Sequence, residues 1–405
     1  MSFQQGLSGL NAASRNLDVI GNNVANANTV GAKASRAEFA DVYATSLSGA
    51  GSSFNGIGVS VADVTQQFTQ GDITTTNSAL DMAINGRGFF RMSNDGEMTY
   101  TRNGQFQLDK NGYIVNAQGG RLTGYPADAN GQVNAGVPVD LRLQTGDIAP
   151  RATDAGTVVA NLDAAATTPA SPFGVADATS YNGATSLAVF DSQGAEHTVA
   201  VYFRKAADNT WDVYGAADGT AVGAGPLGTF SFGADGRLLP TSAKSVTVNV
   251  PISAAAGGTL SVPLDLSRLT QFGSSFSVSE LAQTGSAAGR LAGFAIGSDG
   301  TVLARYTNGQ TLAQGRVVLA NFTNPQGLAS LGGNQWAETA DSGAPMAGSP
   351  GAGSLGVIQS GALEQSNVDL TAELVNMITA QRLYQANAQT IRTQDQIMQT
   401  IVNLR

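Results

Sequence analysis

The chain has 405 residues, a formal net charge of −9 and no cysteine. An acidic chain without a basic cluster does not suit phosphate recognition, so a nucleic-acid-binding protein is excluded. The lack of cysteine excludes disulfides, thiol nucleophiles and thiolate metal sites. The length favours two or three domains, and 50 glycines favour β-structure with many tight turns.

Residues 1–33 carry the pattern of a helix that packs along one face. Its apolar stripe is made of Leu7 and of residues spaced by seven: Phe3, Leu10, Leu17 and Val24. The Asn-rich stretch from Asn22 to Lys33 predicts the end of this helix and a turn-rich connection.

The first ten residues lack the basic segment and the long apolar core of a secretory signal, so no cleaved signal peptide is predicted. No part of the sequence reaches the roughly 18 consecutive apolar residues that a membrane span requires. Secretion of such a chain would need a dedicated export route.

Residues 34–71 and 353–365 are predicted to be linkers. Helix is expected to resume briefly over 34–47, and strand-like alternation begins at Val59. Two Gly-rich and Ser-rich stretches, 49–58 and 343–356, suit joints between layers, because Gly permits wide φ/ψ excursions. The candidate hinge residues are Gly49, Gly51, Gly56, Gly351, Gly353 and Gly356.

Residues 72–144 and 286–352 are predicted to form one β domain from two parts of the chain. Asn-Gly and Asp-Gly dipeptides, which fit the positive φ angles of type I′ turns, separate short apolar runs. These dipeptides begin at Asn85, Asp95, Asn103, Asn111 and Asn130 in the first part, and at Asp299 and Asn308 in the second.

Residues 145–285 are predicted to form a second all-β domain inserted into the first. An Ala, Thr and Pro run over 152–184 is not assigned to strands. Alternating strands are predicted at 198–203, 211–214, 229–232, 245–252 and 259–266. The fold class is therefore multidomain α+β, with a discontinuous coiled-coil region of terminal helices and two mainly antiparallel β domains.

Residues 366–405 contain the longest helical pattern, with Asn367 or Asp369 as N-cap. One seam repeats every seven residues at Leu370, Met377, Tyr384, Ile391 and Met398, and the alternate seam holds Leu374, Gln381, Ala388, Asp395 and Val402. A pair of helices that meet along such a polar seam would be only weakly stable. Neighbouring subunits are therefore expected to cover the seam. The predicted assembly interface is Phe3, Leu7, Leu10, Leu17, Val24, Leu370, Leu374, Met377, Tyr384, Ile391, Met398 and Val402.

One glycine motif resembles a dinucleotide fingerprint. Gly351, Gly353 and Gly356 match G-x-G-x-x-G, but no strand is predicted before them, and Glu373 belongs to a helix. A flexible Gly-rich linker is the better interpretation, and no cofactor is predicted.

Other polar residues also fall short of an active site. His197 is the single histidine and lies on a predicted strand, so a structural or exposed role is favoured over catalysis. The turn from Asp109 to Gly112 lacks the oxygen-ligand run of a calcium loop. We predict no enzymatic activity and no metal.

Two long motifs, one near each end, carry a family resemblance. The segment from Ser8 to Asp41 contains the core Asn-Asn-x-Ala-Asn-x-x-Thr-x-Gly, made of Asn22, Asn23, Ala25, Asn26, Thr29 and Gly31. The second motif, SNVDLTAELVNMITAQRLYQANAQTI, runs from Ser366 to Ile391 within a match over Gly361–Arg405. Through both, the chain resembles the bacterial flagellar axial proteins, the family of rod, hook and hook-associated subunits. Ala32 departs from that family, which usually has an aromatic residue there.

Within that family, the chain is more similar to hook subunits than to the shorter rod subunits, which lack its insert over 145–285. Further hook-like segments lie at 80–90, 100–112, 189–194, 201–203, 211–214 and 315–332. The resemblance covers most of the chain.

The resemblance implies a subunit of a hollow helical polymer that acts as a universal joint between the rod and the filament. Terminal helices would line an export channel, the split β domain would form a middle layer, and the insert would form the surface. The implied partners are other copies of the chain, the distal rod protein, the hook cap, the hook-filament junction protein, the length-control protein and the flagellar type III export apparatus. The implied location is the extracellular flagellum. A rod-type subunit and a secreted β-rich adhesin or glycan-binding module stay open as alternatives.

Overall fold

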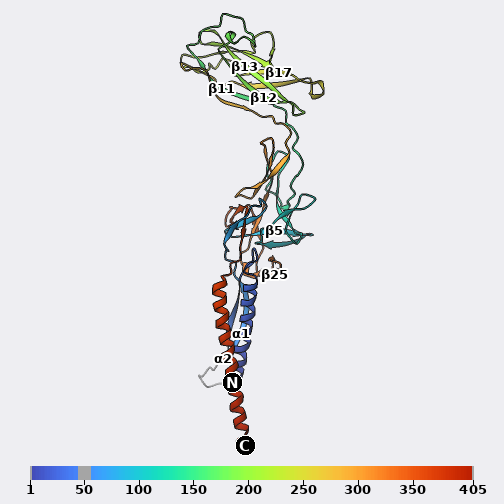
Figure 1. Cartoon of the computed structure of the whole chain (residues 1–405), viewed down its shortest axis with the longest axis vertical. Helices are drawn as coiled ribbons and strands as arrows, with labels where there is room; N and C mark the ends of the chain where they lie inside the picture. Colours follow the sequence, from blue (N-terminus) through green and yellow to red (C-terminus); the bar gives the residue numbers. More distant parts are fainter. Residues whose placement is uncertain (1, 44–55, 404–405) are drawn as a thin grey trace. The chain divides into compact units, whose positions relative to one another are not determined.

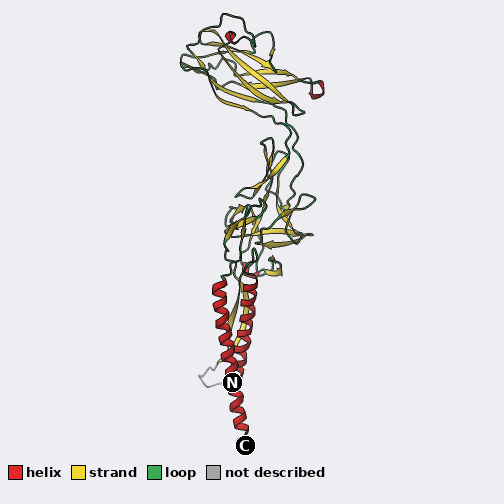
Figure 2. Cartoon of the chain, viewed as in Figure 1, coloured by secondary structure: helices red, strands yellow, loops and turns green. Residues whose placement is uncertain are grey.

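The computed structural model describes residues 2–43 and 56–403 (Figure 1). They form two compact units. The first unit comprises Met1–Thr145, Gly293–Ala304 and Leu312–Arg405, and the second comprises Gly146–Ala292 and Arg305–Thr311. Figure 2 shows that both long helices belong to the first unit and that strands dominate the second. The predicted multidomain α+β class, with one β domain inserted into another, is confirmed.

The helices α1 (Ser2–Ala25) and α2 (Leu370–Asn403) lie side by side and run antiparallel (Figure 1). Asn23, near the end of α1, hydrogen-bonds Glu373, near the start of α2, whereas Gly6 lies against Ile391. Asp369 is the N-cap of α2, because its carboxylate accepts hydrogen bonds from two backbone N–H groups of the first turn.

The described part of the segment after α1 forms two paired strands, which corrects the helix predicted over 34–47 and the linker predicted over 34–71 where they are described; residues 44–55 lie outside the described residues. Strands β1 (Ser35–Tyr43) and β2 (Gly56–Gln66) pair antiparallel, and Phe39 lies opposite Val61. The backbone N–H of Val59 donates to Ser8 Oγ, so the hairpin packs along α1. Pairing with β2, the next strand in the chain, thus overrides the local helix propensity of β1.

The β region of the first unit joins strands from both parts of the chain, as predicted. Strand β9 pairs with β23, β5 pairs with β24, and β6 pairs with β26. The strands contributed by the first part are β3 (Ile73–Thr75), β4 (Met82–Asn85), β5 (Phe89–Asn94), β6 (Glu97–Thr101), β7 (Gln107–Leu108), β8 (Ile114–Val115), β9 (Arg121–Pro126) and β10 (Val139–Asp140).

The later strands carry the chain back toward α2. They are β21 (Leu291–Ile296), β22 (Thr301–Tyr306), β23 (Thr311–Val317), β24 (Leu319–Asn321), β25 (Ala329–Gly332), β26 (Gln335–Ala337), β27 (Met346–Gly348), β28 (Val357–Ser360) and β29 (Ala362–Glu364), with the 3-10 turn η3 (Pro325–Gly327). The predicted linker over 353–365 is wrong, because β28 pairs with β4 and β29 pairs with β3. The segment before α2 therefore belongs to the β structure as far as Glu364.

Two apolar clusters stabilise the first unit. The larger one includes Phe90, Leu122, Val317 and Ile358, all buried. The smaller one is aromatic: Phe68, Phe89 and Trp336 meet edge-to-face at centroid distances of 5.4 to 5.7 Å, a favoured ring geometry. The Trp336 indole also donates a hydrogen bond to Gln66 Oε1, so the cluster holds the end of β2.

The second unit is built from two five-stranded sheets around one apolar core. Its strands are β11 (Gly156–Asp163), β12 (Gly183–Phe190), β13 (Glu196–Ala207), β14 (Thr210–Ala217), β15 (Thr220–Val222), β16 (Gly228–Ser231), β17 (Ser245–Pro251), β18 (Thr259–Asp265), β19 (Thr270–Phe272) and β20 (Ser277–Gln283), with the 3-10 turns η1 (Ala178–Ser180) and η2 (Ala254–Ala256). The run over 152–184 contains β11, which pairs with three other strands. Its alternating burial shows that a strand was missed there.

Candidate assembly surface

Small residues let α1 and α2 approach each other closely. A Cβ atom on Gly6 would lie 3.1 Å from the Ile391 side chain, and one on Gly9 would lie 2.8 Å from Asn387. Ile20 of α1 and Ala380 of α2 are buried. Glycine therefore makes room on α1 for the larger side chains of α2.

Asn23 of the N-terminal motif joins three elements at the upper end of the helix pair. Its Nδ2 donates to the Ser35 carbonyl at 2.8 Å and to Glu373 Oε1 at 2.9 Å, and its Oδ1 accepts from the Ser35 N–H at 2.8 Å. The side chain is buried, so these hydrogen bonds replace those that water would make. One asparagine thus holds α1, β1 and α2 together.

Gly31 is the last residue of the same motif, and its backbone is constrained by its conformation and by its neighbours. Its φ of +72° is a conformation that favours glycine, and a Cβ atom would lie 2.5 Å from the backbone nitrogen of Asn103. Its N–H donates to the carbonyl of Glu364 at 2.8 Å. The motif therefore brings the chain against both β6 and β29.

Asn367 makes a matching junction before α2. Its Oδ1 accepts from the Ala34 N–H at 2.8 Å, and its Nδ2 donates to the Gln67 carbonyl at 2.7 Å. Ala34 and Gln67 flank the β1–β2 hairpin and also hydrogen-bond each other. The hairpin base is thus tied to the start of α2.

A buried ionic triad lies beneath these junctions. Lys33 Nζ is 2.6 Å from Glu364 Oε1, and Arg102 Nη1 is 3.0 Å from Glu364 Oε2, with all three side chains almost completely buried. Lys33 also donates to the Thr69 carbonyl, and Arg102 to the Gly86 carbonyl. One carboxylate therefore connects the segment after α1 to the β region.

Burial controls the ionisation of the two cations. Desolvation lowers the pKa values of both Lys33 and Arg102 below their ordinary values, and the attraction of Glu364 opposes that shift without cancelling it. Loss of Glu364 would leave two buried cations uncompensated, so the triad depends on this carboxylate.

The seam between α1 and α2 differs in register from the prediction. The side chains of α2 shielded from solvent are Glu373, Met377, Ala380, Asn387, Ala388, Ile391 and Gln394. Of the predicted alternate positions, Ala388 is partly shielded, whereas Leu374, Gln381, Asp395 and Val402 are exposed. In this register polar Asn387 lies against Gly9, where a Cβ atom would overlap it.

The predicted interface residues divide into two groups in the structure. Leu10, Leu17, Val24, Met377 and Ile391 are partly shielded, whereas Phe3, Leu7, Leu370, Leu374, Tyr384, Met398 and Val402 are exposed. Leu374 is 49%, Met398 56% and Val402 70% exposed. A single chain therefore leaves much of this apolar surface without a partner.

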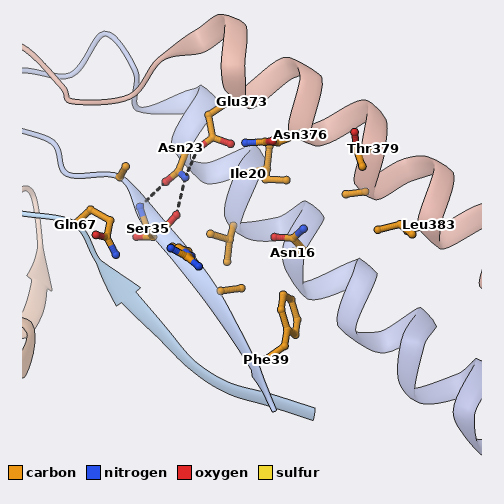
Figure 3. Close-up of a pocket in the computed structure, with 15 residues that line it drawn as sticks. Asn16, Ile20, Asn23, Ser35, Phe39, Gln67, Glu373, Asn376, Thr379 and Leu383 are labelled. Carbon is orange, nitrogen blue, oxygen red and sulfur yellow. Dashed lines mark hydrogen bonds between the residues drawn. The ribbon is translucent and has the colours of Figure 1, made fainter. Parts of the chain in front are cut away.

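A groove of about 500 Å³ opens between the helices and the hairpin (Figure 3). Figure 3 shows Phe39 of β1 facing Asn16 and Ile20 of α1, with Leu383 of α2 on the opposite wall. The lining is mixed, with polar residues such as Asn16 and Arg36 beside apolar ones, and the large apolar side chains Phe39 and Leu383 are 42% and 55% exposed. We call it the hairpin groove.

The candidate hinge glycines have different environments. Gly49 and Gly51 lie outside the described residues, and Gly56 is the first residue of β2, opposite Tyr43. Gly351 to Gly356 form a turn closed by a backbone hydrogen bond of 2.9 Å, and Gly356 also donates to the Arg87 carbonyl. Where a flexible linker was predicted, the structure has a closed turn that leads into β28.

His197 lies on β13 in the second unit. Its Nδ1 is 2.8 Å from Asp218 Oδ2, and its Nε2 is 3.8 Å from Asp191 Oδ2. The hydrogen bond with His197 lowers the pKa of Asp218 below its ordinary value. These contacts link β13 to neighbouring turns, which fits a structural histidine.

Over residues 2–43 and 56–403, no group of three or more His, Asp or Glu side chains is arranged to hold a metal ion. Neither α1 nor α2, as far as each is described, has the apolar length that crossing a bilayer needs.

The triad was missed by sequence reasoning. Lys33 and Glu364 are 331 positions apart, and no local pattern pairs them. One usable signal existed: Glu364 follows Ala362 and Leu363, so a charge in an apolar strand required a buried partner.

Four family models, all of flagellar proteins, match segments of this chain. Residues 3–33 match the family model "Flagella basal body rod protein", and residues 359–404 match "Flagellar basal body rod FlgEFG protein C-terminal". Residues 83–158 match "Flagellar hook protein FlgE/F/G D1 domain", and residues 161–286 match "Flagellar basal body protein FlaE D2 domain". The fold and the helix pair therefore define an axial protein of the bacterial flagellum.

Full-length relatives identify the branch of that class. The chain is 44% identical to the flagellar hook protein FlgE of Escherichia coli and to that of Salmonella typhimurium, and 34% identical to that of Brucella suis. Each alignment covers 100% of this chain and 98 to 100% of the relative. The chain belongs to the flagellar hook protein family and is a structural subunit of the hook.

A solved structure shares the fold. The Helicobacter pylori flagellar hook protein FlgE2 aligns with a TM-score of 0.54 at 14% identity, over 72% of this chain and 100% of that one.

Proposed function

We propose that the chain polymerises through its terminal helices into a hollow, curved and flexible tube. The tube carries an export channel and transmits motor torque to the filament as a universal joint. The single observation that supports this proposal is the exposed apolar surface of α1 and α2, which one chain leaves uncovered. Covering it with copies of the same chain gives a polymer whose inner layer is helical.

Folding of the terminal helices is coupled to this assembly. The polar seam, with Asn387, Gln394 and Glu373, makes the isolated helix pair weak. Contacts with neighbouring copies stabilise the helical form by mass action, so the helices gain order as the polymer grows.

The polar side of α2 suits a channel wall. Gln385, Gln389, Gln396 and Thr393 are exposed, and the only charged residues from 374 to 403 are Arg382, Arg392 and Asp395. A surface with few charges and many amides binds both charged and apolar segments weakly, so an unfolded chain can pass along it.

The other partners follow from the position of a hook. They are the distal rod protein at one end, the hook cap and the hook-filament junction protein at the other, and the length-control protein. Export proceeds through the flagellar type III apparatus to the outside of the cell, without cleavage of a signal peptide.

Electron microscopy of the concentrated purified protein tests the proposal. A curved tube is expected. A straight tube would contradict the proposed curvature, and a protein that stays monomeric at high concentration would overturn the proposal that the chain assembles by itself.

A further inference from the structure

We propose that the last turns of α2 in one subunit dock into the hairpin groove of the next subunit, in a head-to-tail contact. The occupant is thus a second copy of this chain. The inference rests on the proposed function, because it specifies the contact by which the polymer grows.

The last turns of α2 form an apolar projection without a partner. Figure 1 shows α2 continuing beyond the described residues of α1, and residues 395–403 span about 13 Å of helix. Met398 and Val402 are more than half exposed, and Ile397 is nearly half exposed. Met398 and Val402 lie on the same face of α2 as Ile391, which packs against Gly6 of α1. The apolar face of α2 therefore extends beyond the end of α1.

The hairpin groove is the complementary feature at the other end of the helix pair. Its walls come from α1, α2 and β1, and it combines exposed Phe39 and Leu383 with buried Ile20. The groove lies beside Asn23 and Glu373, whereas the projection begins beyond Ile391. Because α2 is a continuous helix, its last turns cannot fold back into the groove that its first turns help to form. The projection can therefore fill a groove only in another copy of the chain.

Charge supports this pairing. Arg36 lines the groove and is exposed, and it has no ion-pair partner within the described residues. Asp395 lies at the base of the projection, three residues before Met398 and seven before Val402, so these side chains share one helix face. Docking the apolar face therefore brings a carboxylate toward the free guanidinium. Both carboxylates accept an amide hydrogen bond within the chain, Glu373 from Asn23 and Asp395 from Gln399, but Asp395 is exposed whereas Glu373 is half-buried.

The geometry also decides the kind of assembly. Two different patches on one subunit make a heterologous contact, which propagates from copy to copy as an open filament. A self-complementary contact would stop at a dimer.

Paired cysteines test the contact directly, because the chain has none of its own. In the variant Leu383→Cys with Met398→Cys, mild oxidation of assembled protein is expected to give a ladder of covalent multimers on a denaturing gel. The matched control Val137→Cys with Met398→Cys uses another exposed apolar site of the same unit and is expected to give no ladder. Tubes without the Leu383–Met398 ladder, or with covalent dimers only, would overturn the inference and leave the proposed function standing. Failure of the wild-type chain to form tubes would overturn both.

A charge exchange gives an independent readout. Arg36→Asp and Asp395→Arg should each raise the critical concentration for assembly by roughly two- to five-fold, the scale of one exposed ion pair. The double variant should restore it. Single variants that assemble like the wild type, or a double variant no better than the singles, would contradict the docking of Asp395 beside Arg36.

Discussion

At the scale of single residues, buried polar side chains set the geometry between the helices and the β region. Asn23, Asn367 and Glu364 each contact segments far apart in the sequence. Their hydrogen bonds are directional, so they fix orientation in a way that apolar packing alone does not.

Glu364→Gln should destabilise the first unit by about 3 to 5 kcal/mol, because it leaves Lys33 and Arg102 buried without an anion. Urea unfolding followed by Trp336 fluorescence measures this in a Trp211→Phe background, since each unit contains one of the two tryptophans. Asp140→Asn is the control, because it breaks the more exposed Arg121 pair and should cost no more than about 1 kcal/mol. Equal losses in both variants would contradict a special role for the triad.

The alkaline stability of the first unit should depend on Tyr100. Burial and then the hydrogen bond to Glu338 raise the pKa of Tyr100 to about 12. An unfolded tyrosine loses its proton near pH 10, so the folded state holds the proton more tightly. Its contribution is complete below pH 10 and is lost as the pH rises toward 12.

Comparison with Tyr100→Phe isolates that contribution. The variant should lose less stability than the wild type between pH 10 and 12 in urea unfolding followed by Trp336. The lowered pKa of Lys33 has the opposite effect, because it makes the folded state more stable as the pH rises. Both proteins contain Lys33, so this effect cancels when their stabilities are subtracted. Parallel pH curves would show that Tyr100 does not titrate in this way.

At the scale of elements, α2 serves both its own chain and the polymer. Its start is tied to the hairpin and to α1, whereas its later turns are increasingly exposed. Removing the later turns should therefore separate folding from assembly.

Deletion of the last twenty residues is expected to leave the β units folded and the protein monomeric. It removes Asn387 and Ile391, which cover Gly9 and Gly6, together with the exposed Met398 and Val402. Unchanged near-UV circular dichroism with no tubes in electron micrographs is the expected result. Tubes formed by the truncated chain would contradict an inner layer made of terminal helices.

The polar face of α2 can be tested by export. Gln389→Leu with Gln396→Leu should slow secretion of later flagellar subunits, because an apolar wall retains unfolded chains. Gln389→Asn with Gln396→Asn keeps the amides and should export normally. Normal export by the leucine variant, with intact tubes, would show that these residues do not face the channel.

At the scale of the whole molecule, a rotating curved tube requires each subunit to change its axial spacing in every turn. Local strain must be absorbed somewhere in the chain, and the Gly-rich stretch over 49–58 is the predicted place. Gly356 is a poor hinge by comparison, since a Cβ atom there would lie 2.5 Å from the carbonyl oxygen of Asn85.

Gly49→Ala with Gly51→Ala should stiffen the assembled tube without lowering the stability of the subunit. The measurement is the shape fluctuation of tubes in electron or light micrographs. Gly356→Ala is the contrasting variant, in which steric overlap should destabilise the subunit by about 1 to 3 kcal/mol. Tubes of unchanged flexibility in the double variant would contradict a hinge at 49–51.

The sequence by itself determined the two terminal helices and the nested order of the two β domains in this protein. Heptad spacing predicted both terminal helices, Asn-Gly and Asp-Gly turns predicted a β domain shared by two parts of the chain, and the interruption between them predicted the insert. These features depend on local chemistry and periodicity, which a single sequence displays directly.

Only the tertiary structure decided the helix register, the β1–β2 hairpin, the strands at 357–364 and the Lys33–Glu364–Arg102 triad. The β1–β2 hairpin depends on a partner strand 13 to 31 positions away, and the other features depend on partners hundreds of positions away, so local propensity does not identify them. Glycines 6 and 9 leave room for Ile391 and Asn387 of α2, and burial makes each unpaired charge costly enough to select a single arrangement.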